Sequence, residues 1–267
     1  MKTVKGLADT GDKVTITGEN FGTDPSDISV SFNGTPAEFE LVDESTIVAT
    51  TPADYQTGSV TVTIHGYTMT GGAMFNPNSK GDVTVLYLQN YKQPFAKAND
   101  ESWKNGEWWT PAVWNQNAAS FNAKGNTTVS GMQYKSEEGL TLAFQNGWDK
   151  EAYTNGKIWQ VATLRPGKYR LEVTYAYTLV VTDAGNFISV LIAKGDSESD
   201  IPNVADLEQL NGVCAIYDKA GINDDSGILV TPSFEVTETT DVVIGFLTSL
   251  AKGNSYFKVT ELKLILE

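Results

Sequence analysis

Hydrophobic and polar residues alternate in short runs along the first part of this 267-residue chain, as they do in half-buried β-strands. Residues 13–17, Lys-Val-Thr-Ile-Thr, form one such run, and a glycine-bounded turn from Gly18 to Gly22 follows it. Similar runs occupy residues 28–32, 37–41, 46–50, 59–65 and 69–75. Strands of this length, spaced by roughly ten residues with Gly, Asn and Pro between them, predict a small antiparallel sandwich.

The second part of the chain has longer runs of the same kind. Residues 157–164 and 168–181 are joined by Arg165-Pro166-Gly167, which predicts a tight turn, and further runs lie at 187–193, 227–230, 234–236, 242–247 and 256–266. The alternation slips between Val259 and Leu262, which predicts a β-bulge near Glu261. The one helical pattern covers residues 204–210. Long strands with long loops predict a larger jelly-roll β-sandwich of the galactose-binding-like kind.

A compact polar segment separates the two parts. Residues 76–81 read Asn-Pro-Asn-Ser-Lys-Gly, and an apolar run from Val83 to Leu88 follows them. The chain is long enough for two domains that each bury a core. We therefore predict a first domain over residues 1–76, a linker over 77–82 and a second domain over 83–267.

Four ordered segments of the first domain resemble an IPT/TIG domain, which has an immunoglobulin-like fold. They are Val-Thr-Ile-Thr-Gly-Glu-Asn-Phe-Gly at 14–22, Val-Ser-Phe-Asn-Gly at 30–34, Thr-Ile-Val-Ala-Thr-Thr-Pro at 46–52 and Gly-Ser-Val-Thr-Val-Thr-Ile at 58–64. The sequence departs from the family at its front, where the usual first strand and its proline are not recognisable. The resemblance implies a spacer or protein-contact module that presents the second domain.

The second domain resembles a group of similar C-terminal domains, called DUF5013. The segments that carry the resemblance are Trp-Thr-Pro-Ala-Val-Trp at 109–114, Asn-Gly-Lys-Ile-Trp-Gln at 155–160 and Leu-Arg-Pro-Gly-Lys-Tyr at 164–169. Such domains follow IPT/TIG modules in surface lipoproteins of Bacteroidetes polysaccharide-utilisation loci. The resemblance implies a cell-surface glycan-binding protein, similar in role to the SusE and SusF type, and it supplies no catalytic residues.

All six tryptophans of the chain lie in the second domain. An indole face suits stacking on a sugar ring, because the ring's axial C–H groups are apolar and weakly positive. Trp114 has apolar neighbours and is predicted to be in the core. The exposure of Trp159 depends on which face of its strand points inward; Ile158, Ala162 and Leu164 form the more apolar face, which would leave Trp159 outward.

The remaining tryptophans fall in two polar segments, 99–111 and 145–153, which are predicted to be loops. Sugar recognition also needs amide, carboxylate or hydroxyl groups that pair with sugar hydroxyls, and the second segment supplies them. A loop that only caps the end of the sandwich is the alternative for both segments. The predicted carbohydrate-binding residues are Trp103, Trp108, Trp109, Asn146, Trp148, Asp149 and Tyr153.

Charge and composition limit the other functions. The formal net charge of −14 disfavours nucleic acid and anionic membrane surfaces as partners, and a neutral glycan remains compatible. The single cysteine, Cys214, excludes an intrachain disulfide and a multi-cysteine metal site. With His65 as the only histidine, a histidine-based zinc site and a Ser-His triad are both disfavoured. We expect no cofactor. The acidic loops 196–200 and 223–226 offer oxygen ligands to a structural calcium ion, and the alternative is that they are ordinary solvated loops.

The sequence therefore predicts a non-catalytic glycan-binding protein, with an oligosaccharide or polysaccharide as its partner and outer-membrane transport proteins as further partners. Alternatives are an adhesin-like interaction subunit of a surface assembly and a glycoside hydrolase or its accessory domain. No apolar run approaches the roughly 20 residues of a membrane helix. We expect a secreted protein or an outer-membrane lipoprotein whose export or anchoring segment lies outside this chain.

Overall fold

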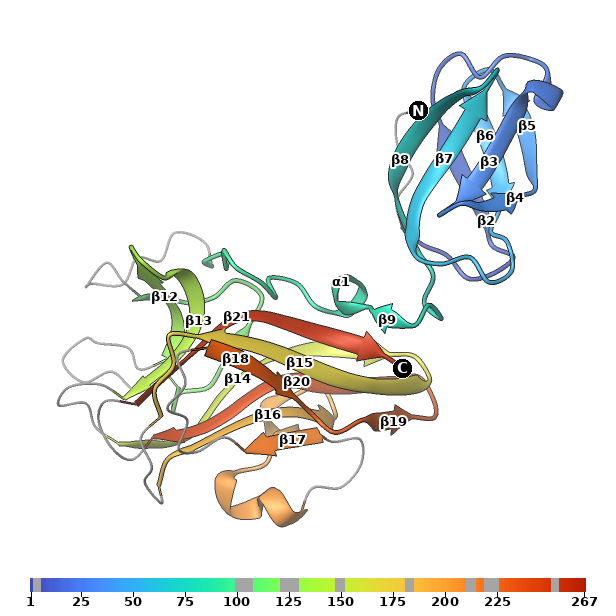
Figure 1. Cartoon of the computed structure of the whole chain (residues 1–267). Helices are drawn as coiled ribbons and strands as arrows, with labels where there is room; N and C mark the ends of the chain where they lie inside the picture. Colours follow the sequence, from blue (N-terminus) through green and yellow to red (C-terminus); the bar gives the residue numbers. More distant parts are fainter. Residues whose placement is uncertain are drawn as a thin grey trace. The chain divides into compact units, whose positions relative to one another are not determined.

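The computed structural model describes residues 1, 6–98, 108–120, 130–146, 152–180, 185–209, 215–218, 226–250 and 255–267. The chain divides into two compact units, Met1–Gly81 and Asp82–Glu267. Strands dominate both units (Figure 1). The all-β fold class is confirmed.

The first unit is an immunoglobulin-like sandwich. Ile16, Phe32, Ile47, Tyr55 and Val62 are fully or almost fully buried in its core. One sheet has the order β1 (Gly6–Leu7), β8 (Tyr67–Phe75), β7 (Gly58–Ile64), β3 (Ile28–Phe32) and β4 (Thr35–Ala37); the other has β2 (Lys13–Thr17), β6 (Thr46–Thr50) and β5 (Phe39–Asp43), and η1 (Pro25–Asp27) precedes β3.

Two expectations for this unit need correction. A strand does precede residue 13, because β1 pairs in parallel with β8, with Gly6 opposite Met74. It escaped detection because two exposed residues carry no alternation. The run predicted over 37–41 is divided between β4 and β5, which lie in different sheets.

Part of the polar segment after β8 belongs to the first unit. The Asn76 side-chain amide donates to the Tyr55 carbonyl at 2.7 Å, and the Thr57 backbone N–H donates to Ser79 Oγ at 3.0 Å. Beyond it, the Val83 backbone N–H donates to the Leu264 carbonyl at 2.9 Å. The division between the units falls within residues 77–82.

The second unit is the larger sandwich, with its core between two sheets (Figure 1). Its short helical elements are α1 (Thr84–Tyr87), η2 (Glu198–Asp200) and η3 (Val204–Gln209). The first sheet has the order β10 (Trp108–Trp109), β12 (Ser130–Lys135), β13 (Gly139–Asn146), β21 (Ser255–Leu266), β15 (Gly167–Ala176) and β18 (Ser226–Val230), with β19 (Phe234–Val236) on β15 and β9 (Gly81–Asp82) on β21. The second has β11 (Asn115–Gln116), β14 (Tyr153–Leu164), β20 (Thr240–Leu250), β16 (Phe187–Lys194) and β17 (Ala215–Asp218).

The predicted turn and bulge of this unit are confirmed. β14 ends at Leu164 and β15 begins at Gly167. The register between β15 and β21 shifts so that Thr174 lies opposite Glu261 and Tyr175 opposite Val259, which leaves Thr260 as the extra residue. The predicted helix is instead the 3-10 segment η3.

The outer face of the second sheet carries a second hydrophobic cluster. Trp159 lies opposite the main core, as predicted, but only 7% of it is exposed. The cluster around Trp159 also includes Ile201, Val204 and Leu207, which come from the segment of η2 and η3. Trp159 thus faces away from the main core without being exposed, because this distant segment covers it.

Candidate functional site

Four segments at one end of the larger sandwich are joined in a closed ring of backbone pairs. Residues 96–98 run antiparallel to 110–112, where the Ala98 N–H donates to the Thr110 carbonyl and the Ala112 N–H to the Ala96 carbonyl. β10 continues this second segment and pairs with β12, which pairs with β13. The Phe95 N–H closes the ring on the Leu140 carbonyl at 3.4 Å.

A glycine permits the close approach of β10 and β12 in this ring. Gly131 has φ +138°, and a Cβ atom at this position would lie 2.9 Å from the Trp109 carbonyl oxygen. A side chain would therefore strain the backbone and push the two strands apart.

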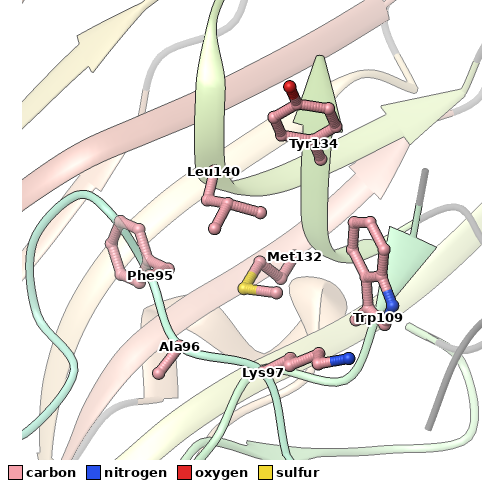
Figure 2. Close-up of a pocket in the computed structure, with 7 residues that line it drawn as sticks. All are labelled: Phe95, Ala96, Lys97, Trp109, Met132, Tyr134 and Leu140. Atoms are coloured by element: carbon pink, nitrogen blue, oxygen red, sulfur yellow. The ribbon is translucent and has the colours of Figure 1, made fainter. Parts of the chain in front are cut away.

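The ring encloses a pocket with a cavity volume of about 490 Å³. Figure 2 shows Met132 between Phe95 and Trp109, with Tyr134 and Leu140 above them. The pocket is lined by Phe95, Ala96, Lys97, Trp109, Met132, Tyr134 and Leu140.

Strand register explains how these side chains meet. Trp109 lies directly opposite Met132, and Tyr134 lies directly opposite Leu140, so all four share one face of the sheet. Met132 and Phe95 are each only 1% exposed and belong to the main core, whereas 44% of Tyr134 is exposed. The pocket therefore has an apolar floor formed by the core and an aromatic wall that reaches solvent.

The pocket has few polar groups. Lys97 is exposed, and the Tyr134 hydroxyl is the other polar group that a lining side chain brings to the mouth. Trp109 is half-buried; its indole Nε1 is buried and, in the described part of the chain, has no hydrogen-bond partner. Among the described residues, the lining includes no carboxylate.

Of the predicted site residues that the structure describes, Trp109 lines this pocket, although it lies in strand β10 and not in a loop. Its neighbour Trp108 is also in β10, and the loop prediction is wrong for it as well. Trp108 pairs with Gln133 on the opposite face of the sheet and is 3% exposed. Because strand neighbours point to opposite faces, the two rings do not act together.

Tyr153 and Asn146 are likewise strand residues, and both are buried inside the sandwich. The Tyr153 hydroxyl lies 3.3 Å from Ser130 Oγ and 3.1 Å from Thr248 Oγ1, and burial raises its pKa to about 12. The Asn146 amide donates to the Leu250 carbonyl at 2.8 Å. Both side chains support the interior, and neither presents a surface for a ligand in this structure.

Other predictions have different outcomes. Trp114 is confirmed as a core residue, with 5% of it exposed and its indole N–H donated to the Asn90 carbonyl. The sequence reasoning missed Phe95, Met132, Tyr134 and Leu140 as site residues, and the aromatic Tyr134 in an alternating run was the one available signal. Trp103, Trp148, Asp149 and Cys214 lie outside the described residues.

The acidic loop at 196–200 satisfies its own polar groups. Asp200 Oδ2 accepts hydrogen bonds from the Asp196 and Ser197 N–H groups and from Ser197 Oγ, and these bonds lower the pKa of its carboxyl. Within the ranges that the structure describes, no three His, Cys, Asp or Glu side chains gather as a metal site. Of the second acidic loop, only Ser226 is described.

His65 lies on the surface of the first unit. Its side chain is 67% exposed, and Nδ1 lies 3.6 Å from Asp27 Oδ2. Within the described ranges, no helix has the length and apolar character to cross a membrane.

Comparison with solved structures finds similarity at low sequence identity. A proposed glycoside hydrolase from Bacteroides thetaiotaomicron is 10% identical, with 100% of this chain and 91% of that chain covered and a TM-score of 0.44. TmCBM61 in complex with β-1,4-galactotriose is 13% identical, with 64% and 97% covered and a TM-score of 0.33. The CBM22-1 xylan-binding domain of Paenibacillus barcinonensis Xyn10C is 12% identical, with 64% and 97% covered and a TM-score of 0.34. None of the curated proteins matches the chain.

Family models account for most of the sequence. The IPT/TIG domain model matches residues 2–79, and the model of the domain of unknown function DUF5013 matches residues 89–245. The order of the two domains agrees with the resemblance found in the sequence. The chain therefore belongs to the DUF5013 family and carries an IPT/TIG domain ahead of that domain.

Proposed function

We propose that the larger unit binds a glycan in the pocket around Trp109. The observation that carries this proposal is the pair of partly exposed rings, Trp109 and Tyr134, on one face of a preformed pocket. An aromatic wall beside an apolar floor suits the apolar face of a sugar ring. Because the backbone ring fixes the wall, little ordering is needed on binding.

Polar groups at the mouth provide the hydrogen bonds that a sugar requires. The Tyr134 hydroxyl can donate and accept, and the Lys97 ammonium can donate to sugar oxygens. Glycoside hydrolysis requires two carboxyl groups flanking the scissile bond, and the lining residues that the structure describes supply none. We infer binding without catalysis.

A second candidate is the docking of an apolar side chain from a partner protein. The observation in its favour is that five of the seven lining residues, all but Lys97 and Tyr134, have wholly apolar or indole side chains. This function corresponds to the interaction subunit of a surface assembly. It predicts that no glycan competes for the pocket.

Affinity gel electrophoresis and calorimetry against soluble starch, pectic galactan, xylan and mixed-linkage β-glucan distinguish the two functions. Glycan binding predicts that at least one polysaccharide retards the chain and that Tyr134→Ala weakens this binding about threefold to tenfold, the loss expected for one stacking contact. Trp109→Ala should weaken it further. Tyr67→Ala is the matched control, because Tyr67 is 81% exposed and lies in the first unit.

Retardation that is equal for the wild type, Trp109→Ala and Tyr134→Ala would place glycan binding elsewhere. Trp103, Trp148 and Asp149, which lie outside the described residues, would then be substituted next, because the sequence predicts them as binding residues. Absence of retardation on every polysaccharide would favour the protein-docking function.

We further propose that this binding takes place outside the cytoplasm, at a cell surface or after secretion. The composition supports it, because one cysteine with abundant Thr, Asn, Gly and aromatic residues fits a secreted bacterial β-protein better than a disulfide-stapled one. Surface proteolysis of intact cells, with the chain detected by antibody, tests the location. Protection from the protease in intact cells would refute it.

A further inference from the structure

We propose that the pocket receives the terminal residue of a glycan chain, with the rest of the chain leaving through the same mouth. This inference rests on the proposed glycan binding and concerns which part of the glycan is recognised. Its basis is the closed ring of paired segments around the pocket.

The ring blocks lateral passage of a polymer. A groove that binds the middle of a chain needs an entrance and an exit, so it must be open at two ends. Here residues 95–98 pair on one side with 110–112 and meet β13 on the other side through Phe95 and Leu140, while β10, β12 and β13 complete the circuit. Backbone hydrogen bonds close each of these boundaries.

The floor blocks passage through the ring. Phe95 and Met132 are each 1% exposed. Met132 lies directly opposite Leu142 on the neighbouring strand, and Leu142 is fully buried in the core. The pocket therefore ends blindly in the hydrophobic core. Among the described residues of the lining, Tyr134, Ala96 and Lys97 are exposed, and the mouth lies there.

The size of the cavity agrees with a short ligand. A volume of about 490 Å³ lies in the lower half of the range of about 300–1,000 Å³ that is typical of small-molecule sites. Such a space accommodates one or two sugar rings. A third residue would extend past Tyr134 and Lys97, beyond the lining, and would add little affinity.

The test uses the full chain and a polysaccharide that the chain binds, chosen from starch, galactan, xylan and β-glucan. Mild acid hydrolysis shortens that polysaccharide about tenfold, which raises the number of chain ends per unit mass about tenfold. Recognition of ends predicts that the apparent affinity per unit mass rises by a similar factor, because each end is one site. Oligosaccharides of two to six units should reach constant affinity at two units.

Borohydride reduction of the oligosaccharides identifies the end. It opens the reducing-end ring, so loss of binding after reduction assigns that end, and unchanged binding assigns the other end. Ala96→Trp places a large side chain at the mouth from an exposed position and should abolish binding. Ala118→Trp, at an exposed position outside the lining, should bind like the wild type.

Affinity that grows steadily up to six units, or that stays constant per unit mass after shortening, would overturn end recognition and leave glycan binding intact. Wild-type binding by Ala96→Trp would place the glycan outside this pocket, and would overturn both end recognition and the proposed site. If the chain binds no polysaccharide and no oligosaccharide, the proposed function fails and this inference fails with it.

Discussion

Trp109 and Trp159 are strand tryptophans of the same sandwich, and they differ in what lies over them. Trp159 is covered by residues of the η2 and η3 segment and packs in its own cluster with Leu191 and Leu247. Trp109 lies at the edge of the main core and forms one wall of an open pocket. Trp159 therefore contributes to the stability of the sandwich, whereas Trp109 remains accessible to a ligand.

The cover over Trp159 is fixed by polar contacts as well as by packing. Lys157 Nζ donates to the Ile201 carbonyl at 2.7 Å, and the Val204 N–H donates to Asn155 Oδ1 at 2.8 Å. Burial lowers the pKa of Lys157, so holding its charged form there has a cost. The bond to the Ile201 carbonyl and the negative charges of Glu198 and Asp206 offset that cost. The comparison teaches that exposure of a sheet tryptophan depends on whether a distant segment is anchored over it.

Removal of the covered ring should have the largest effect on stability. Trp159→Ala leaves a cavity between the sheet and its cover, and the free energy of unfolding should fall by about 3–5 kcal/mol. Urea denaturation measures the loss, and calorimetry on the folded variant should show wild-type glycan affinity. A small change in stability would mean that the cover does not pack on the ring, and the distinction from Trp109 would disappear.

Alternation predicted the strands that have one buried face. The bounds of β2, β3, β6 and β19 agree with those expected from the sequence, because each of these strands is short and bounded by turn residues. β12 and β13 were missed although their sequences alternate, with Leu140, Leu142 and Phe144 set between small or polar residues. In the structure both faces are buried over Ser130 to Gln133 and Thr141 to Phe144. Polar residues such as Gln133 and Thr141 made these buried strands resemble loops.

The pocket was less accessible to sequence reasoning than the fold. Indole chemistry identified Trp109, but its partners Phe95, Met132 and Leu140 come from separate segments that only the ring of backbone pairs brings together. The same limitation affected Tyr153, whose polar neighbours suggested a loop although its hydroxyl is satisfied inside the sandwich. Local composition gives the type of each side chain, but it does not show which distant residues pack over that side chain.

Tyr153 offers a second test of the division between interior and pocket, through pH. Its pKa is about 12 in the folded chain and about 10 in the unfolded chain, so the folded state binds more protons between these values. The stabilisation is therefore fully present below about pH 10, and roughly 2–3 kcal/mol of it is lost as the pH rises to about 12. Tyr153→Phe should lack this loss.

Urea denaturation of the wild type and Tyr153→Phe across this pH range measures the difference, and the comparison cancels other groups that titrate there, including Tyr169. At neutral pH the variant should bind glycan like the wild type. Parallel pH profiles would contradict burial of the Tyr153 hydroxyl, and loss of binding would return Tyr153 to the site.

The smallest expected effect concerns the charge at the mouth of the pocket. If the aromatic wall carries the binding of a neutral glycan, affinity should be unchanged between about 50 and 500 mM NaCl, because screening acts on charge pairs and not on stacking. Lys97→Gln should cost about twofold to threefold through one hydrogen bond, and Lys13→Gln in the first unit should cost nothing. A steep salt dependence that vanishes in Lys97→Gln would instead identify an anionic ligand held by the ammonium group. In that case Trp109 would contribute a wall to an electrostatic site, and its openness relative to Trp159 would not be the reason that the ligand binds there.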